Sequence, residues 1–295
     1  MALAISPTAN ASLVAIAHEK GFFKDEGIEI SLATKDSGRD SLEAVSRGKV
    51  QAATASCFAF STRALNDPSL RVLASIGATT GSRIVARKDR NIRKPSDLKG
   101  KRIGYVSDTI SEYYLHSFLV TENLRIGDVK AVDLPAGRHA EALARGEVDA
   151  ISASEFYAYR AERLLGENVV AWDCQNNIAY QWLLVVREDS LQSPEPLKRL
   201  LKALIRAENF TRANEEEARG IVVRRLGVDP DYAQEAWNRT HLDVSLSQSV
   251  VTNLRVFTRW RMRRSGQDGK PPDVLEYLSP GILDEVAPES VTVYR

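Results

Sequence analysis

The sequence predicts an α/β fold made of two Rossmann-like lobes, with the chain crossing between them twice. Three observations point to this class. A fourteen-residue pattern occurs twice, at 43–56 and 141–154, and strand-like and helix-like segments alternate along most of the chain. The length of 295 residues also allows two domains. We expect one lobe to comprise residues 1–84 and 185–295, and the other to comprise residues 85–184.

The repeated pattern reads EAVSRGKVQAATAS in its first copy and EALARGEVDAISAS in its second. Each copy predicts a helix that ends at glycine, the usual residue of a left-handed C-cap, and then a short apolar strand that stops at serine. The copies lie 98 residues apart, which is too long a period for a solenoid. Because open α/β sheets bind ligands beyond the carboxyl ends of their strands, Ser56 and Ser154 are candidate ligand-binding residues.

The elements of the first lobe follow from periodicity and from turn residues. An apolar stripe at Leu13, Ile16 and Ala17 predicts the first helix, and Gly21 is its expected C-cap. The order of elements predicts parallel strands with right-handed crossovers. We expect strands at 2–6, 28–32, 50–55 and 70–76, and helices at 11–20 and 41–47.

The second lobe and the C-terminal region show the same kinds of signal. Pro95 predicts the start of a short helix. Asn214 and the acidic residues that follow it indicate a helix cap and a first helical turn. The apolar run 180–186 returns the chain to the first lobe. The other expected elements are a crossing segment at 82–88, strands at 102–106, 131–134 and 169–172, and helices at 111–120, from 194 onward, near 230–238 and at 246–264.

Composition excludes several classes of function. A formal net charge of +1 gives no reason to expect nucleic acid as a partner, and the basic stretch 259–264 is typical of a solvated helix end. No apolar run approaches the roughly 18 residues of a membrane-spanning helix. Cys57 and Cys174 fall in different lobes, so we expect two buried thiols. The four histidines are scattered, so the sequence predicts no metal site.

Five segments, in order, resemble the substrate-binding proteins of ABC importers for aliphatic sulfonates, taurine and nitrate, a superfamily that includes binding proteins for thiamine-pyrimidine precursors. The resemblance covers nearly the whole chain. The segments are GFFKDEGIEI (21–30), PSDLKGKRIGY (95–105), EALARGEVDAI (141–151), LKRLLKALIRAENFTRANEEEA (197–218) and APESVTVYR (287–295).

The resemblance implies a periplasmic-binding-protein type II fold whose lobes close on a small organic ligand, anionic or heteroaromatic, about hinge strands near 82–87 and 183–187. It further implies a non-catalytic role without a cofactor, in which the ligand passes to an ABC membrane permease. The expected partners are therefore that ligand and the permease, without nucleic acid, and the expected state is a monomer. The implied location is periplasmic, or extracytoplasmic with a lipid anchor, with a leader peptide missing from the given sequence.

The chain departs from the resemblance after the second repeat. Where sulfonate and taurine binders often carry Trp-Asp/Glu-Pro, this sequence has Ser154, Glu155 and Phe156. The missing tryptophan removes a flat wall and leaves room for a ligand larger than taurine. We expect Glu155 to accept a hydrogen bond from a donor on that ligand, and Tyr157 to supply a stacking face; a solvated surface acid is the alternative for Glu155.

Several loops supply further candidates, and for each of them capping or a simple turn is the alternative. Helix N-termini carry unpaired N–H groups that favour anions, which makes the loops before the predicted helices candidate ligand contacts. The candidate residues, all of which follow predicted strands, are Thr8, Asn10, Ser37, Thr79, Thr80, Ser107, Thr109 and Ser111.

An enzyme on the same scaffold is the alternative function. The resemblance extends to desulfinases with a cysteine in the cleft and to thiamine-precursor synthases with a Cys-rich motif, and a ligand-sensing domain of a receptor is a third possibility. Cys57 follows Ser56 at a predicted strand end, but no histidine neighbours it and the Cys-rich motif is absent. The lack of a nucleophile–base pair favours binding, and the identity of the ligand stays open.

Overall fold

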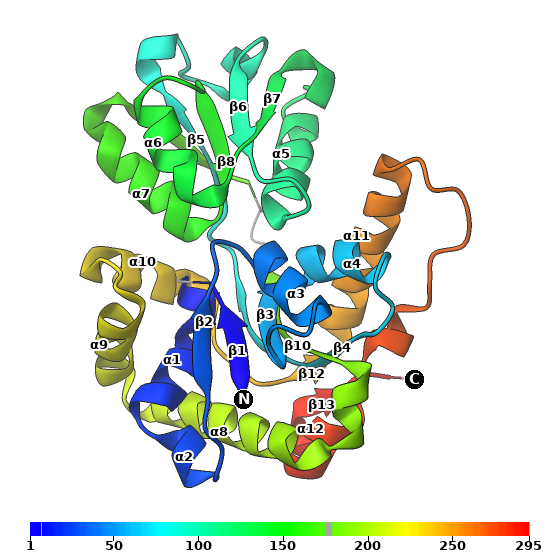
Figure 1. The fold of residues 1–295 in the computed structure, drawn as a ribbon. Coiled ribbons are helices and arrows are strands. Elements are labelled where there is room, and N and C mark those ends of the chain that lie inside the picture. Colours follow the sequence, from blue (N-terminus) through cyan, green and yellow to red (C-terminus); the bar gives the residue numbers. More distant parts are fainter. Residues whose placement is uncertain (7, 175–178, 295) are drawn as a thin grey trace. The chain divides into compact units, whose positions relative to one another are not determined.

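The computed structural model describes residues 1–6, 8–174 and 179–294, which form two compact units (Figure 1). Unit 1 comprises Met1–Thr79 and Tyr180–Arg295, and unit 2 comprises Thr80–Ala179. The units divide after residues 79 and 179, whereas the sequence predicts boundaries five residues later, after residues 84 and 184. The two segments expected as hinges lie inside the sheets of the units, as strands β5 and β10.

Unit 1 contains a six-stranded sheet in the order β11-β4-β10-β3-β1-β2. β1, β2 and β3 pair in parallel, as the sequence predicts. β10 lies between β3 and β4 and is antiparallel to both, so β4 runs in the direction of β3 without pairing with it. The strands are β1 (Ala2–Ile5), β2 (Ser31–Thr34), β3 (Ala52–Ser56), β4 (Leu70–Thr79), β10 (Tyr180–Arg187) and β11 (Thr240–His241).

Helices cover both faces of this sheet. α1 packs on α8 and α9, and α4 packs on α11, and Figure 1 shows these two groups on opposite sides of the unit 1 strands. The helices are α1 (Ser12–Glu19), α2 (Phe22–Asp25), α3 (Gly38–Ser46), α4 (Cys57–Ala64), α8 (Pro194–Ala213), α9 (Glu215–Leu226), α10 (Pro230–Arg239), α11 (Gln248–Arg264) and α12 (Pro280–Val286). Short strands β12 (Leu246–Ser247) and β13 (Val291–Thr292) pair in parallel.

Unit 2 repeats this plan on a smaller scale, with a sheet in the order β7-β6-β8-β5-β9. Three strands are parallel, and β5 is antiparallel to both of its neighbours, as β10 is in unit 1. The elements are β5 (Arg83–Arg87), β6 (Arg102–Tyr105), α5 (Ile110–Thr121), β7 (Lys130–Asp133), α6 (His139–Ala144), β8 (Ala150–Ala153), α7 (Glu155–Leu165) and β9 (Val169–Asp173).

Short 3-10 helices connect the main elements of both units. One of them, at Pro95–Leu98, replaces the short helix expected at 95–99, and another extends the N-terminus of α1. They are η1 (Ala9–Ala11), η2 (Lys88–Arg90), η3 (Pro95–Leu98), η4 (Ile126–Asp128), η5 (Ala136–Arg138), η6 (Gly166–Asn168), η7 (Glu188–Gln192), η8 (Val274–Tyr277) and η9 (Pro288–Ser290).

The sequence repeat corresponds to the same local structure in both units. Gly48 and Gly146 follow α3 and α6 with φ of 67° and 73°, so both adopt the left-handed conformation expected of a C-cap. In unit 1 the Gln51 side chain accepts a hydrogen bond of 2.7 Å from the backbone N–H that opens β1. At the equivalent position of unit 2, Asp149 accepts one of 2.9 Å from the N–H of Arg102, which opens β6.

One expectation about a helix end is corrected. Asn214 precedes α9, but its side chain does not cap that helix; its Nδ2 donates to the carbonyl of Phe210 at the end of α8. The sequence also gave no signal for α4 and α7, which begin directly after the two repeat strands. No helix in the described part of the chain is long and apolar enough to span a membrane.

Candidate functional site

Two buried hydroxyls lie where the chain leaves β1 in unit 1. The side-chain oxygens of Ser6 and Thr8 are shielded from solvent, and neither has a hydrogen-bond partner among the described residues. The Thr8 N–H donates to the Ser6 carbonyl at 2.8 Å. Buried polar groups in proteins are nearly always paired. These two hydroxyls therefore lack, among the described residues, the partner that a buried hydroxyl usually has.

The serines expected from the neighbouring strands are helix caps. Ser37 precedes α3, accepts from the N–H of Asp40 at 3.2 Å and donates to its carboxylate at 2.7 Å. Ser56 precedes α4 and accepts from the N–H of Ala59 at 3.2 Å. The Ser56 hydroxyl donates to no described residue, so its proton is available to an acceptor, whereas that of Ser37 is used.

Gly38 allows these two caps to approach each other. A Cβ at this position would lie 3.0 Å from Ala55 Cα and 3.4 Å from the backbone nitrogen of Ser56. Backbone atoms cannot move aside as the end of a flexible side chain can. The first turn of α3 therefore rests directly on the end of β3, which places Ser37 beside Ser56.

We expect Gly38→Ala to lower the free energy of unfolding by about 1–3 kcal/mol, because the added methyl group must push α3 away from β3. Urea denaturation followed by circular dichroism measures this loss. Gly281→Ala is the matched control, since a Cβ there meets nothing within 4 Å. Equal stabilities of the two variants would show that the contact does not hold α3 in place.

Cys57 is the first residue of α4, and its thiol is held inside unit 1. The side chain is fully buried, and its Sγ lies 3.8 Å from Oε1 of Gln181. Burial raises the pKa of the Cys57 thiol to about 12. Burial also raises the pKa of Cys174 in unit 2, with the nearby charge of Asp173 adding to the shift. A thiol with so high a pKa is almost entirely protonated at neutral pH and is a poor nucleophile.

We therefore expect neither thiol of the native protein to react with iodoacetamide at pH 8 on a time scale of minutes. Both should react fully once the chain is unfolded in guanidinium chloride. Intact-mass spectrometry counts the labels. Rapid labelling of Cys57 in the native protein would instead indicate an accessible, activated thiol.

Of the remaining candidates, Asn10 and Thr79 are buried in unit 1. Asn10 lies in η1, and the neighbouring Ala9 N–H donates to the hydroxyl of Tyr232 at 3.1 Å. Thr79 ends β4, and its Oγ1 accepts from the Thr240 hydroxyl at 3.4 Å. Thr80 opens unit 2 and is partly exposed. A role of Asn10, Thr79 and Thr80 in ligand binding stays a prediction.

In unit 2, the three hydroxyls expected before α5 all donate within the unit. Ser107 donates to the carboxylate of Asp133 at 2.7 Å, and Thr109 donates to the Val106 carbonyl at 2.8 Å. Ser111 donates to the Ser152 carbonyl at 2.7 Å. These bonds tie the loop to the ends of β6, β7 and β8. A ligand acceptor would have to displace one of them, so their role as ligand donors stays a prediction.

Ser154 and Glu155 lie at the start of α7. Ser154 occupies the N-cap position without a side-chain capping bond. Glu155 is only 2% exposed, and burial raises its pKa to about 7, although its own backbone N–H and the charge of Arg83 act in the opposite direction. Arg83 forms an ion pair of 2.8 Å with Glu162. Glu155 is thus a buried carboxyl group rather than the solvated surface acid of the alternative.

Tyr157 packs into the hydrophobic core of unit 2. Its ring meets the ring of Phe156 with a centroid distance of 5.1 Å and that of His139 at 6.4 Å, both edge to face. Burial lowers the pKa of His139 to about 4, so this ring is neutral at physiological pH. The stacking role expected of Tyr157 stays a prediction.

The sequence reasoning missed Ser6 and Trp182. Ser6 directly follows β1, and the only available signal was its place at a strand end. Trp182 lies in β10, where it is the Cα partner of Ser56, and its indole Nε1 has no hydrogen-bond partner among the described residues. A single tryptophan inside the apolar run 180–186 was the signal for it.

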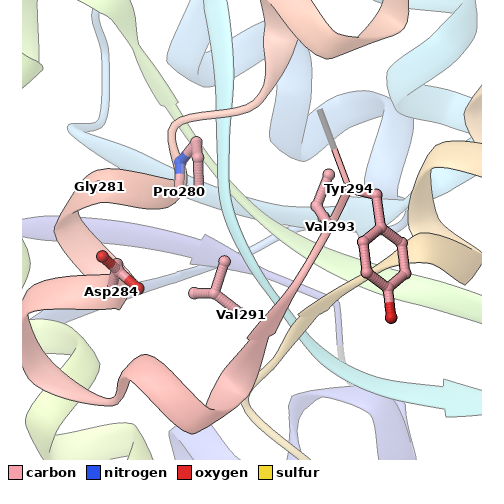
Figure 2. Close-up of a pocket in the computed structure, with 6 residues that line it drawn as sticks. All are labelled: Pro280, Gly281, Asp284, Val291, Val293 and Tyr294. Carbon is pink, nitrogen blue, oxygen red and sulfur yellow. The ribbon is translucent and has the colours of Figure 1, made fainter.

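Other hollows lie away from these residues. A pocket of about 480 Å³ is formed by the C-terminal segment of unit 1, between α12 and the residues around β13 (Figure 2). None of the candidate residues lines it; the lining residues are Pro280, Gly281, Asp284, Val291, Val293 and Tyr294. Within the described ranges, no group of three or more His, Cys, Asp or Glu residues is arranged to hold a metal ion.

Comparison with known proteins identifies similar chains. The model of the NMT1/THI5-like family matches residues 8–218. Relatives from Brucella abortus and Brucella suis, which are named as candidate binding proteins, are 24% identical over 224 residues; the match spans 74% of this chain and 68% of each relative.

Solved structures show the same fold. The alkanesulfonate-binding protein SsuA of Xanthomonas axonopodis pv. citri, bound to MOPS, has a TM-score of 0.80 at 15% identity over 95% of this chain and 98% of that one. SsuA of Escherichia coli has a TM-score of 0.75 at 15% identity, over 94% and 96%. The desulfurization enzyme DSZB has a TM-score of 0.67 at 18% identity, over 98% and 99%. The predicted periplasmic-binding-protein fold is confirmed.

Proposed function

The chain belongs to the NMT1/THI5-like family, and from this premise we propose that it is an extracytoplasmic solute-binding protein. In this role it captures a small organic ligand and delivers it to an ABC permease. The names of the relatives and of several similar structures support solute binding. The ligand class depends on the residues of the site, because fold alone does not define function.

The observation that carries the proposal is the pair of buried, unpartnered hydroxyls of Ser6 and Thr8. They lie at the carboxyl end of β1, which is next in the sheet to the end of β3. At the end of β3, the Ser56 hydroxyl accepts a hydrogen bond but donates none to the described residues. A carboxyl edge of this kind is where open α/β sheets take their ligands. Hydroxyl donors at a helix N-terminus suit a group rich in acceptor oxygens, such as a sulfonate, carboxylate or phosphonate.

The thiols favour binding over the alternative of catalysis. A desulfinase-like reaction requires a reactive cysteine, and both cysteines of this chain are buried with raised pKa values. Cys57 also forms its contact with Gln181 rather than with a base. The similarity to DSZB therefore reflects a shared fold, and a turnover assay with an aromatic sulfinate tests the alternative directly.

A thermal-shift screen over alkanesulfonates, aromatic sulfonates, carboxylates and pyrimidines tests the proposal. A solute present at 100 times its Kd should stabilise the protein by about 2.7 kcal/mol. For the best solute, we expect Ser6→Ala and Thr8→Val each to weaken binding about 10-fold in calorimetry, within the cost of about 1–3 kcal/mol for an unpaired group.

Ser61→Ala is the matched control for these variants. Ser61 is also a buried hydroxyl of unit 1, but it donates to the carbonyl of Cys57 at 2.9 Å. Removal of the Ser61 hydroxyl should lower stability and leave affinity unchanged. Ser6→Ala should instead lower affinity and leave stability unchanged. Loss of affinity in Ser61→Ala alone, or no stabilisation by any solute in the screen, would refute the proposal.

Glu155 remains our proposed acceptor for a donor group on the ligand, such as an amino or ring N–H group. If it has this role, Glu155→Gln should discriminate between ligands. Affinity should fall for a solute that carries the donor and stay constant for the analogue that lacks it. Tight binding of a plain alkanesulfonate, with no effect of the substitution on any solute, would refute this assignment.

A further inference from the structure

Trp182 is a buried hydrogen-bond donor that the fold itself does not use. The residue is 6% exposed, and its Nε1 has no hydrogen-bond partner among the described residues. An indole N–H can only donate, and leaving such a group buried and unpaired is unfavourable. The neighbouring Gln181 is paired, as buried polar groups usually are. Its amide donates to Ser249 at 3.0 Å and accepts from Asn253 at 2.7 Å.

The sheet is irregular at this position. The register between β10 and β4 shifts between Gln181 and Leu183, and Trp182 has no Cα partner on β4. Gly77 on β4 contributes to the irregularity: it has a φ of 149°, and a Cβ there would lie 2.7 Å from the carbonyl oxygen of His241. Bulges re-aim side chains and are frequent next to binding sites. An irregular strand position of this kind is compatible with a nearby binding site.

Trp182 lies at the same edge of the unit 1 sheet as the two unpartnered hydroxyls. It is the Cα partner of Ser56 on β3, and β3 lies directly between β10 and β1. The pairing of Ala4 with Ala53 brings Ser6, two residues on, close to the level of Ala55. Two strand spacings, about 10 Å, therefore separate the backbones of Trp182 and Ser6. One small organic molecule can span that distance.

We propose that Trp182 is a ligand-binding residue, with its indole N–H donating to an oxygen of the solute and its ring lying against an apolar part of the same molecule. This inference rests on the proposed function. It narrows the ligand to a molecule that combines an oxyanion, or another strong oxygen acceptor, with an apolar body. Tryptophan suits this double role because it joins a large apolar face to one polar atom.

Trp182→Phe tests the inference, because phenylalanine keeps an aromatic ring and removes the donor. The probes are MOPS, benzenesulfonate and benzoate, with methyl phenyl sulfone as an uncharged comparison. We expect the variant to bind the anionic probe that binds best about 10-fold more weakly in calorimetry. Without ligand, the substitution removes no hydrogen bond of the described structure, because the native indole forms none there. We therefore expect no fall in melting temperature from this cause.

Fluorescence gives an independent readout. Ligand should alter the tryptophan emission of the native protein, and this change should vanish in Trp182→Phe, although Trp172, Trp237 and Trp260 remain. Trp260→Phe is the matched control; Trp260 belongs to the same unit and packs against Phe58 with a ring-centroid distance of 5.5 Å. This control should keep both the affinity and the emission change.

The outcomes separate the two proposals. If the native protein binds a probe and Trp182→Phe binds it equally well, the role of Trp182 is overturned and the proposed function stands. If the native protein binds none of these probes, the ligand class inferred from Trp182 is overturned. Solute binding as such then fails only if the wider thermal-shift screen is also negative.

Discussion

Between pH 4 and pH 8 the native protein should lose about 3 kcal/mol of unfolding free energy through Glu155 alone. Burial raises the pKa of this carboxyl group from 4.5 to about 7. A shift of one unit corresponds to about 1.4 kcal/mol. The group is 2% exposed, so solvent does little to screen the effect.

The direction follows from proton linkage. Below pH 4.5 the Glu155 carboxyl is protonated in both the folded and the unfolded chain, and its full contribution to stability is present. Between pH 4.5 and about 7 the unfolded chain releases the proton while the folded chain retains it, so stability falls as pH rises. Above pH 7 both states are ionised, and no further loss is expected from this group.

Glu155→Gln isolates the effect from all other titrating groups. The amide has nearly the same shape and no charge, so the variant should match the native protein near pH 4 and exceed its stability by about 3 kcal/mol at pH 8. Urea denaturation of both proteins across this range gives the difference. Glu122→Gln, at an exposed position of unit 2, is the control. A pH-independent difference for Glu155→Gln would show that the carboxyl titrates normally.

Asp149→Ala should lower the stability of unit 2 by about 2 kcal/mol. The carboxylate is buried and accepts from the backbone N–H of Arg102 at 2.9 Å and from its guanidinium at 2.8 Å. The Arg102 side chain is 40% exposed, so solvent weakens the ion pair. We therefore assign most of the effect to the hydrogen bonds that the buried carboxylate makes with the opening of β6.

Gln51→Ala is the natural comparison, since Gln51 holds the opening of β1 at the equivalent position of the repeat. Gln51 is exposed and uncharged, so its loss should cost about 1 kcal/mol or less. Burial opposes ionisation of Asp149, but the hydrogen bonds and charge of Arg102 outweigh it and lower the pKa of the carboxyl below 3.8. The effect of Asp149→Ala should accordingly be complete at neutral pH and shrink below about pH 4. Equal losses of unfolding free energy in Asp149→Ala and Gln51→Ala, measured by urea denaturation, would refute the prediction that Asp149 contributes more.

Much of the fold follows from local signals. Short apolar runs located β1, β3, β6 and β8 to within one or two residues, and Gly48 and Gly146 marked helix ends because only a residue without a side chain adopts their conformation freely. The reasoning missed α4 and α7 because each begins at once after a repeat strand, and no turn residue separates the two elements. It took Ser56 and Ser154 for strand ends, and they are also the N-cap residues of these helices.

The sequence by itself determined the class of fold, the duplicated strand ends and the loops in which polar residues collect, since these depend on periodicity and on the conformations allowed to each residue. Only the tertiary structure decided which hydroxyls are already used. Ser107, Thr109 and Ser111 resemble Ser6 and Thr8 in sequence, but they donate to partners on β7, on the end of β6 and on β8, whereas Ser6 and Thr8 meet none in the described chain. Whether a polar atom is paired depends on residues far away in sequence. For the same reason the buried Nε1 of Trp182 could be recognised only in the folded sheet.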